Sequence, residues 1–392
     1  MTINPLSKFE VWLERFFRPV SVLGFTSDHT SNVKIVQVLT LIVLLPISRS
    51  LYRRVNVMLM ESLWSELVWL MDWWAGVQVR VYIDAESWSY FGNEHALVIS
   101  NHRSDLDWLF GWVLAQRVGC LGSTRAVMKK STKYLPVMGW SMWFSEYIFL
   151  ERSWAKDEKT LKSSFKSLKG FPQPFWLALF VEGTRFTAAK LQQAQEYAAS
   201  SGLPIPRNVL IPRTKGFVAA VSNLREFVPA VYDVSVAVPK ESPPPTMLRA
   251  LSGQASVVHL HIRRVMTSDL PATEDGLSQW CKDAFVLKDD LLDKHREQNT
   301  FGEELYQPIP RPLKPLLVVV GWSAMLVFVS GKLMTPLFST WTGIAWVTGG
   351  LGTIFFLMQI FIMSTQSERS SNLANTRRST SSFKPVTANG KS

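Results

Sequence analysis

Residues 95–112 read HALVISNHRSDLDWLFGW. The apolar run at 96–100 predicts a buried strand, and the amphipathic run at 108–117 predicts a helix. His102 lies in the turn between them, and Asp107 lies at the start of the helix. On one continuous helix this spacing would separate the two side chains by roughly 140°, so they meet only if the turn breaks the helix. The carboxylate would then accept the Nδ1 proton of the imidazole and leave Nε2 as a base.

The same residues allow a purely structural interpretation. Ser104 and Asp107 have the spacing of a helix capping box, in which the carboxylate satisfies backbone amides at the start of a helix. His102 would then be an ordinary polar residue of a loop. On spacing alone, capping is the commoner of the two interpretations, because short motifs often occur by chance.

A second strand-to-turn junction, at residues 175–186, reads FWLALFVEGTRF. Its apolar strand ends in Glu182, Gly183, Thr184 and Arg185. Ligands of open α/β sheets usually bind at such strand ends, and the planar donor fork of arginine suits phosphate oxygens. The alternative is an ordinary turn that contains a Glu–Arg ion pair.

Basic side chains also gather at the ends of other predicted elements. They are Lys129, Lys130, Arg152, Arg213 and Lys215. Each one alone is typical of a solvated surface. Their repeated position at element ends predicts a pocket that binds an anion.

Strands and helices alternate through the middle of the chain. The predicted strands cover residues 96–100, 147–150, 175–181, 227–238 and 256–265, and the predicted helices cover 108–117, 157–169 and 188–200. This order is typical of an α/β fold with a central mixed sheet flanked by helices. We expect residues 80–310 to form a single domain of this kind.

The composition favours a soluble body that carries membrane segments. Apolar residues make up 47% of the 392 residues, charged residues make up 19%, and tryptophan occurs 16 times. The formal net charge of +11 is compatible with anionic lipid, nucleic acid or a small anionic substrate. Two cysteines exclude a disulfide framework. No metal site is expected, because His259 and His261 alternate on one predicted strand without a third ligand nearby.

A transmembrane hairpin is predicted near the C-terminus, within residues 311–363. Residues 341–363 lack charged side chains and are long enough to cross a bilayer, which takes about 20 residues of helix. Residues 316–338 are comparable except for Lys332, which can reach the interface. A disordered basic tail is expected at 364–392.

The N-terminal region, residues 1–79, is also predicted to meet the membrane. The apolar run at 35–47 is short, so the sequence leaves open whether it spans the bilayer. A tryptophan-rich amphipathic helix at 55–74 either packs on the protein core or lies at the membrane interface. Arginines beside the first segment and the basic tail place the body on the cytosolic side by the positive-inside rule.

These motifs together resemble the glycerolipid acyltransferase family, and most of all the membrane-bound 1-acyl-sn-glycerol-3-phosphate (lysophosphatidate) acyltransferases of the plant microsomal type. The His-x4-Asp block, the second block, the Glu-Gly-Thr-Arg block and the Val-Pro-Ala block match residues 101–107, 147–152, 180–186 and 228–230, respectively. Residues 211–217 resemble the Pro-Arg-Thr-Lys-Gly-Phe element of the eukaryotic branch. Four blocks in the same order favour the catalytic interpretation of the first motif over capping.

The resemblance implies that His102 is the general base and that Asp107 orients it. It implies that the glycerol-phosphate end of the substrate is bound by Glu182, Gly183, Thr184 and Arg185, with help from Arg152, Lys215 and Lys130. Many relatives have proline and serine where this chain has Val181 and Phe186. These departures keep the charged groups and concern only the geometry of the turn.

The activity that the resemblance implies is acylation of the sn-2 hydroxyl of lysophosphatidate to phosphatidate, in phospholipid and triacylglycerol synthesis. Acyl-CoA would be the co-substrate, with no cofactor and no metal, and the protein would cross the endoplasmic reticulum membrane. Two alternatives stay open: another lysophospholipid as acceptor, or a non-catalytic membrane scaffold that holds anionic lipid. Nucleic-acid binding is not expected, because no reader motif is present.

Overall fold

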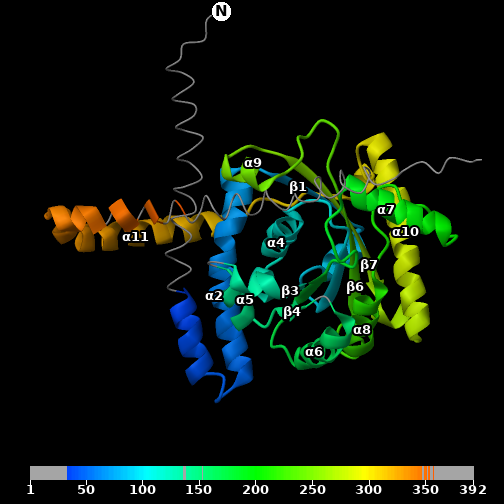
Figure 1. The fold of residues 1–392 in the computed structure, drawn as a ribbon, viewed down its shortest axis with the longest axis horizontal. Coiled ribbons are helices and arrows are strands. Elements are labelled where there is room, and N and C mark those ends of the chain that lie inside the picture. Colours follow the sequence, from blue (N-terminus) through cyan, green and yellow to red (C-terminus); the bar gives the residue numbers. More distant parts are fainter. Residues whose placement is uncertain are drawn as a thin grey trace, which may run out of the picture. The chain divides into compact units, whose positions relative to one another are not determined.

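An eight-stranded sheet organises the first of two compact units of the chain, residues 1–323 (Figure 1). Its strand order is β4-β3-β5-β2-β6-β7-β1-β8. The strands are β1 (Gln78–Tyr82), β2 (Ala96–Ser100), β3 (Thr124–Lys129), β4 (Ile148–Leu150), β5 (Trp176–Leu179), β6 (Ala230–Ala237), β7 (Val257–Met266) and β8 (Tyr306–Gln307). The first five strands in this order run parallel, whereas β7 is antiparallel to β6 and β8 is antiparallel to β1. The predicted mixed α/β sheet is confirmed.

The structure is a computed structural model. It describes residues 33–135, 138–151, 153–346, 348–350, 352–353 and 356. The second compact unit begins at Ala324 and is considered only by itself.

Helices cover both faces of the sheet (Figure 1). The labelled helices are α2 (Arg49–Trp69), α3 (Ala85–Tyr90), α4 (Asp107–Arg117), α5 (Gly139–Phe144), α6 (Trp154–Ser167), α7 (Ala188–Ser200), α8 (Thr214–Leu224), α9 (Met247–Leu251), α10 (Glu274–Gln298) and α11 (Lys314–Phe338), of which α11 continues into the second unit. One core cluster joins α2 and α4 to the sheet, and a second joins α6, α8 and α10 to the opposite face. The side chains of β2 alternate between them, with Ala96 in the first cluster and Leu97 in the second.

The parallel strands β5, β2 and β6 are neighbours in the centre of the sheet. Because they run in the same direction, their carboxyl ends meet at one edge. The segments that follow β2 and β5 are the two strand-end motifs of the sequence. The fold therefore brings residues 101–107 and 182–186 together.

The predicted elements of the body are present, with shifts of a few residues at their ends. The helix predicted at 157–169 begins earlier, at Trp154, because Asp157 accepts hydrogen bonds from the backbone N–H groups of Glu151 and Ser153 and so closes its first turn. Strands β1 and β3 and helices α8 and α10 were not among the predicted elements. Their sequences carry weaker apolar runs or are interrupted by charged residues.

The tryptophan-rich helix packs on the protein core. Trp64 is completely buried and stacks on Trp112 of α4, with ring centroids 4.2 Å apart. Farther along, Trp74 donates from Nε1 to the carbonyl of Leu251 at 3.0 Å. Of the two interpretations left open for this helix, the core position is the one that these tryptophans adopt.

The predicted transmembrane hairpin is described only in part. Helix α11 covers its first half, 316–338, but the side chains at 329–338 and the whole of 357–363 lie outside the described residues. Among the described residues, no helix is both long and apolar enough to cross a bilayer. The basic tail at 364–392 lies outside the described residues.

Candidate functional site

His102 and Asp107 meet at the end of β2. The imidazole Nδ1 lies 2.9 Å from Asp107 Oδ2, and the carboxylate side chain is 1% exposed. The imidazole is 24% exposed and packs against the ring of Phe180, 4.5 Å between centroids. A buried carboxylate on Nδ1 fixes the tautomer and leaves Nε2 as the nitrogen that can accept a proton. The pairing expected from the spacing is therefore present.

Capping and orientation of the histidine use the same carboxylate oxygen. Asp107 Oδ2 also accepts hydrogen bonds from the backbone N–H groups of Arg103 at 2.6 Å and Ser104 at 2.8 Å. The hydroxyl of Ser104, however, accepts from the N–H of Leu106 at 3.2 Å and not from Asp107. Only one half of the predicted capping box is formed, and it holds the aspartate in place for the imidazole.

Asn101 fixes the start of what we call the His102 turn, residues 101–106. Its carboxamide accepts from the N–H of Val236 at 2.8 Å and donates to the carbonyl of the same residue at 3.1 Å. This pair of bonds extends the contact of β2 with β6 beyond the last strand residue. Asn101 belongs to the matched block 101–107, but its bonds to Val236 could not be predicted, because the partner lies 135 residues away.

The Glu182 turn, residues 182–186, holds the backbone of His102 from both sides. Glu182 Oε2 accepts from the N–H of His102 at 3.1 Å, and Phe186 donates its N–H to the carbonyl of His102 at 2.7 Å. The other carboxylate oxygen of Glu182 accepts from the N–H of Leu210 at 3.1 Å. Because this side chain is 2% exposed, burial raises the pKa of Glu182 to about 7. Glu182 is thus directed into the protein and holds the turn, while the polar groups that follow it remain accessible.

The accessible face of the Glu182 turn is polar and basic. Arg185 forms an ion pair with Asp105 of the His102 turn. Lys190, in the first turn of α7, donates to Thr184 Oγ1 and to the carbonyl of Arg185. Gly183 has a positive φ of 68°, and its Cα faces the side chain of Arg213. Gly183, Thr184, Lys190 and Arg213 line a pocket of about 480 Å³ between α7 and residues 210–213. Lys190 was not predicted, because nothing in the sequence distinguishes it from a solvated lysine of a helix.

Of the other predicted anion ligands, the described residues Lys130 and Lys215 form their contacts with groups outside the two turns. Lys130, directly after β3, forms an ion pair with Glu151 at 2.6 Å, and the strand β5 lies between β3 and β2. Lys215, exposed at the start of α8, lies 5.7 Å from the ring centroid of Trp154. Arg152 lies outside the described residues. The role of Lys130, Lys215 and Arg152 in substrate binding stays a prediction.

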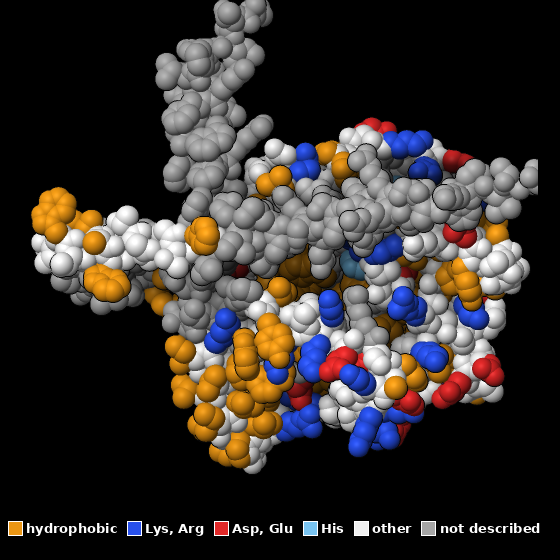
Figure 2. Space-filling view, viewed as in Figure 1, with side chains coloured by type: hydrophobic (Ala, Val, Ile, Leu, Met, Phe, Trp, Pro, Cys, Tyr) orange, Lys and Arg blue, Asp and Glu red, His pale blue; other side chains and the backbone are white. Residues whose placement is uncertain are grey.

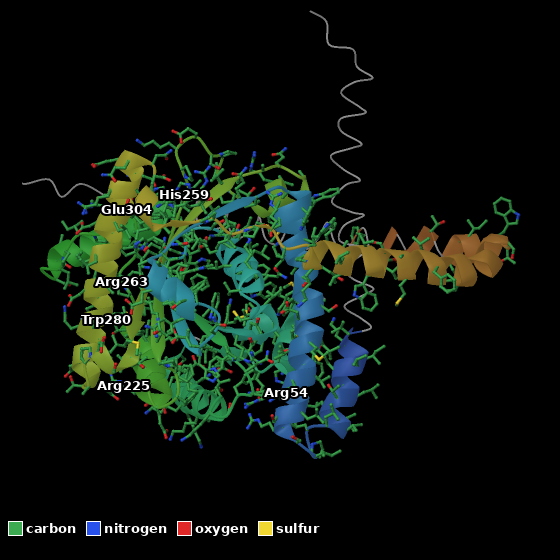
Figure 3. The ribbon with its side chains drawn as sticks, turned by 180° about the vertical axis from the view of Figure 1, so that it is seen from behind. Arg54, Arg225, His259, Arg263, Trp280 and Glu304 are labelled. Atoms are coloured by element: carbon green, nitrogen blue, oxygen red, sulfur yellow. The ribbon has the colours of Figure 1, made fainter. Side chains whose placement is uncertain are left out.

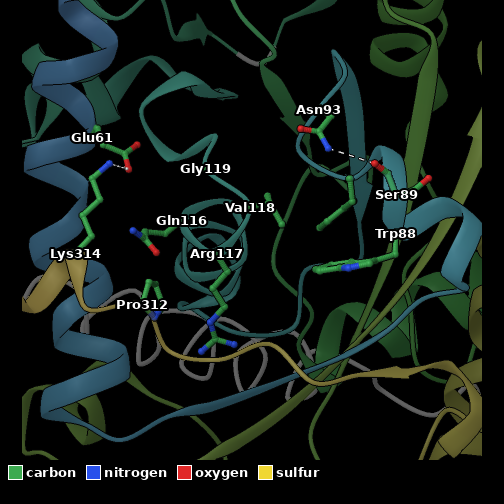
Figure 4. Close-up of a pocket in the computed structure, with 11 residues that line it drawn as sticks. Glu61, Trp88, Ser89, Asn93, Gln116, Arg117, Val118, Gly119, Pro312 and Lys314 are labelled. Carbon is green, nitrogen blue, oxygen red and sulfur yellow. Dashed lines mark hydrogen bonds and ion pairs between the residues drawn. The ribbon is translucent and has the colours of Figure 1, made fainter.

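Another pocket lies at the opposite end of α4 (Figure 4). It has a volume of about 660 Å³ and is bordered by Arg117, Trp88 and the ion pair between Lys314 and Glu61. Asp107 begins α4 whereas Arg117 ends it, so this pocket does not open onto His102. The site of chemistry is therefore assigned by the arrangement of its side chains and not by the size of a cavity.

Metal ligands do not gather in the part of the chain that the structure describes. No group of three or more His, Cys, Asp or Glu side chains there could hold an ion. His259 instead meets His295 of α10, with Nδ1 and Nε2 2.9 Å apart (Figure 3). Burial lowers the pKa of each of these histidines to about 4, so both are neutral near pH 7.

Comparisons with known proteins agree with this arrangement. The acyltransferase family model matches residues 78–239, and the model of the acyltransferase C-terminus matches residues 249–322. The chain is 59% identical over 354 residues to 1-acyl-sn-glycerol-3-phosphate acyltransferase 2 of Brassica napus, and equally so to that of Arabidopsis thaliana, covering 90% of each chain. It is 35% identical to the human 1-acyl-sn-glycerol-3-phosphate acyltransferase gamma, covering 88% of this chain and 91% of the human one. The chain belongs to the family of 1-acyl-sn-glycerol-3-phosphate acyltransferases.

Proposed function

We propose that the protein transfers the acyl group of acyl-CoA to the sn-2 hydroxyl of lysophosphatidate, which yields phosphatidate and coenzyme A. Relatives over nine-tenths of the chain are named for acylation of this acceptor. The observation that carries the proposal is the His102–Asp107 pair at a strand end, with one imidazole nitrogen held by a buried carboxylate. Such a pair can act as a general base on a hydroxyl group.

The reaction needs a single displacement. His102 Nε2 takes the proton from the sn-2 hydroxyl, and the oxygen attacks the thioester carbonyl. As the tetrahedral intermediate collapses, the C–S bond breaks, and the imidazolium returns the proton to the sulfur of coenzyme A. Asp107 stabilises the transient positive charge on the ring, as carboxylates do in other catalytic dyads.

No acyl-enzyme is required, because the thioester is already activated and the available nucleophiles are poorly placed. The hydroxyl of Ser104, the nearest by sequence, donates to the carbonyl of Pro245 at 3.0 Å. Cys120 and Cys281 are buried, and burial raises the pKa of both thiols. A direct attack by the substrate hydroxyl is therefore the simpler route.

The phosphate of lysophosphatidate is proposed to bind at the accessible face of the Glu182 turn. Arg185, Lys190 and Arg213 supply positive charge there, and Thr184 supplies a hydroxyl group. A bound phosphate would fix the distance from the glycerol hydroxyl to His102. Such positioning of the reacting groups raises the rate more than tighter binding alone would. Asp105 would release Arg185 as the phosphate enters.

The decisive experiment measures acyl-CoA-dependent formation of phosphatidate by the full-length protein. We expect His102→Ala and Asp107→Asn to lower kcat by about 10²-fold or more, the usual contribution of a general base. Full activity in both variants would exclude the catalytic role of the pair. A wild-type protein that lacks activity but binds anionic vesicles would support the scaffold alternative, and faster acylation of a lysophospholipid with a larger head group would change the assigned acceptor.

We also propose that the enzyme works at the endoplasmic reticulum membrane with its sheet domain on the cytosolic side. The helix formed by residues 33–43 supports membrane contact, because its polarity is inverted. Gln37 is completely buried and donates to Asn56 Oδ1 at 3.1 Å, whereas Ile35, Leu39 and Ile42 are more than half exposed. Figure 2 shows apolar side chains gathered over the helices that Figure 1 draws in blue. Such a pattern suits an apolar surrounding better than water.

A further inference from the structure

The segment 207–213 supplies one wall of the basic pocket although it forms neither a helix nor a strand. An irregular segment lacks the repeated backbone hydrogen bonds of a helix or a sheet, so other groups must satisfy its N–H groups and fix its course. Three of these N–H groups, those of Arg207, Asn208 and Leu210, donate to side-chain carboxylates. Carboxylates of other elements therefore set the course of this segment.

Asp289 of α10 binds the start of the segment. Its side chain is buried, and its Oδ2 accepts from the N–H of Arg207 at 2.9 Å while its Oδ1 accepts from the N–H of Asn208 at 2.6 Å. Asp293 lies one turn later on the same face of α10 and accepts from Asn208 Nδ2 at 2.6 Å. Two consecutive residues of the segment are thus attached to one face of α10.

The other end of the segment is attached to the candidate site. The N–H of Leu210 donates to Glu182 Oε1 at 3.1 Å, and the N–H of Arg213 donates to the carbonyl of Val181 at 2.7 Å. The side chain of Arg213 lies against the Glu182 turn, because a Cβ added to Gly183 would lie 3.0 Å from its Cδ. The position of the Arg213 guanidinium in the pocket therefore depends on the course of the segment.

The ion pairs at the same place do not account for the buried position of Asp289. The Arg207 guanidinium, which is 53% exposed, pairs with Asp290 at 2.6 Å and Asp293 at 2.7 Å, and it lies 3.5 Å from Asp289. Exposed ion pairs of this kind contribute little to stability. Charge-assisted hydrogen bonds from backbone N–H groups to a carboxylate are stronger and more directional. The contacts of Asp289 are thus those of a group that fixes a backbone.

We propose that Asp289 is a positioning residue for the acceptor substrate, which acts by holding segment 207–213 so that Arg213 faces the phosphate. This inference rests on the proposed function, in which the basic pocket binds the phosphate of lysophosphatidate. Asp289 is not among the described residues that border the pocket, so it acts through the segment. Asp107 uses the same arrangement on α4, where its carboxylate accepts two N–H groups of the His102 turn.

The test compares Asp289→Asn with Asp290→Asn in the full-length protein. Asparagine keeps the size of the side chain but has one acceptor oxygen, so one backbone N–H loses its partner. We expect Asp289→Asn to raise the KM for lysophosphatidate about tenfold, the usual effect of losing one charge-assisted hydrogen bond. The kcat and the KM for acyl-CoA should stay within about twofold. Asp290 is exposed and bonds only to the Arg207 side chain, so Asp290→Asn should resemble the wild type.

A double-mutant cycle with Arg213→Gln separates positioning from a general loss of stability. Arg213→Gln alone should raise the KM for lysophosphatidate about tenfold. In that background Asp289→Asn should add less than about twofold, because the group that it positions is already gone. Additive effects of the two substitutions would overturn the inference, and so would an Asp289→Asn protein with an unchanged KM for lysophosphatidate.

Direct binding of isotope-labelled lysophosphatidate, measured in lipid nanodiscs, separates this inference from the proposed reaction. The wild type should bind about tenfold more tightly than Asp289→Asn. A wild type that binds lysophosphatidate in this way but forms no phosphatidate would refute only the reaction, whereas equal binding by the two proteins would refute the positioning role. If Asp289→Asn does not fold, Asn208→Ala leaves the carboxylate in place and removes only the carboxamide bonds to α10. It should weaken binding about threefold, and unchanged binding would again refute the positioning role.

Discussion

Glu182 is a buried side chain whose two carboxylate oxygens hold separate parts of the candidate site together. Both of its carboxylate oxygens accept backbone N–H groups, one from His102 and one from Leu210. A buried carboxylate needs such donors, because burial without them would neutralise it. Glu182 therefore sets the position of the histidine and joins it to the segment that borders the basic pocket.

Glu182→Gln tests this positioning role. Glutamine has one carbonyl oxygen, so only one of the two N–H groups keeps its acceptor and the other faces an NH₂ group. We expect the free energy of unfolding to fall by about 1–3 kcal/mol, and kcat to fall while the KM for lysophosphatidate changes little. A large rise in that KM at unchanged kcat would instead mean that Glu182 binds the substrate.

The pH dependence of stability gives an independent check of the same residue. The pKa of Glu182 is raised to about 7 from an ordinary value of 4.5. A raised pKa means that its contribution to stability is present below pH 4.5 and is lost as the pH rises through 7. The free energy of unfolding of the wild type, relative to Glu182→Gln, should therefore decrease between pH 5 and 8. The free energies of unfolding can be measured by urea denaturation at each pH. If those of the two proteins change with pH in the same way, the raised pKa does not belong to Glu182.

At the scale of elements, the close approach of α2 to the turn after α4 fixes one wall of the domain. Gly122 donates its N–H to Glu61 Oε2 at 2.7 Å. A Cβ at this glycine would lie 2.1 Å from the carbonyl oxygen of Val57, which is backbone of α2 and cannot move alone. The absence of a side chain at Gly122 is therefore what allows α2 to lie against the sheet domain here.

Gly122→Ala should force α2 away from this turn. We expect a loss of about 1–3 kcal/mol in the free energy of unfolding, as for other overpacked sites, measured by chemical denaturation. Gly111→Ala is the matched control, because no atom lies within 4 Å of its added Cβ and it lies inside α4. That substitution should stabilise the protein by about 0.5–1 kcal/mol. Equal effects of the two substitutions would refute the packing argument.

At the scale of the whole molecule, the sequence predicted local features well but did not predict contacts between distant residues. The strand β2 and the pairing of His102 with Asp107 follow from residues that are five apart, so they could be read directly. The inward direction of Glu182 depends on donors 28 and 80 residues away, and the contact of Asn101 with Val236 depends on a residue 135 positions away. Such contacts are set by topology, which residue spacing alone does not specify.

The inverted polarity of the helix at 33–43 leads to a prediction about the surroundings of the whole protein. Leu39 is 55% exposed on that helix, and Leu287 is 57% exposed on α10, so the two are matched in size and exposure. With a polarity-sensitive fluorophore attached to Leu39→Cys in lipid nanodiscs, we expect blue-shifted emission that is quenched by nitroxide-labelled lipid, because the bilayer covers this face.

The same fluorophore at Leu287→Cys should emit as in water and resist lipid quenching. The native Cys120 and Cys281 are buried, so labelling at the new cysteines is selective. The comparison does not depend on whether another segment keeps the protein on the membrane, since it reports the depth of one side chain. Water-like emission at both positions would show that the exposed apolar face at 33–43 meets something other than lipid, and the catalytic turns would then need another route for their lipid substrate.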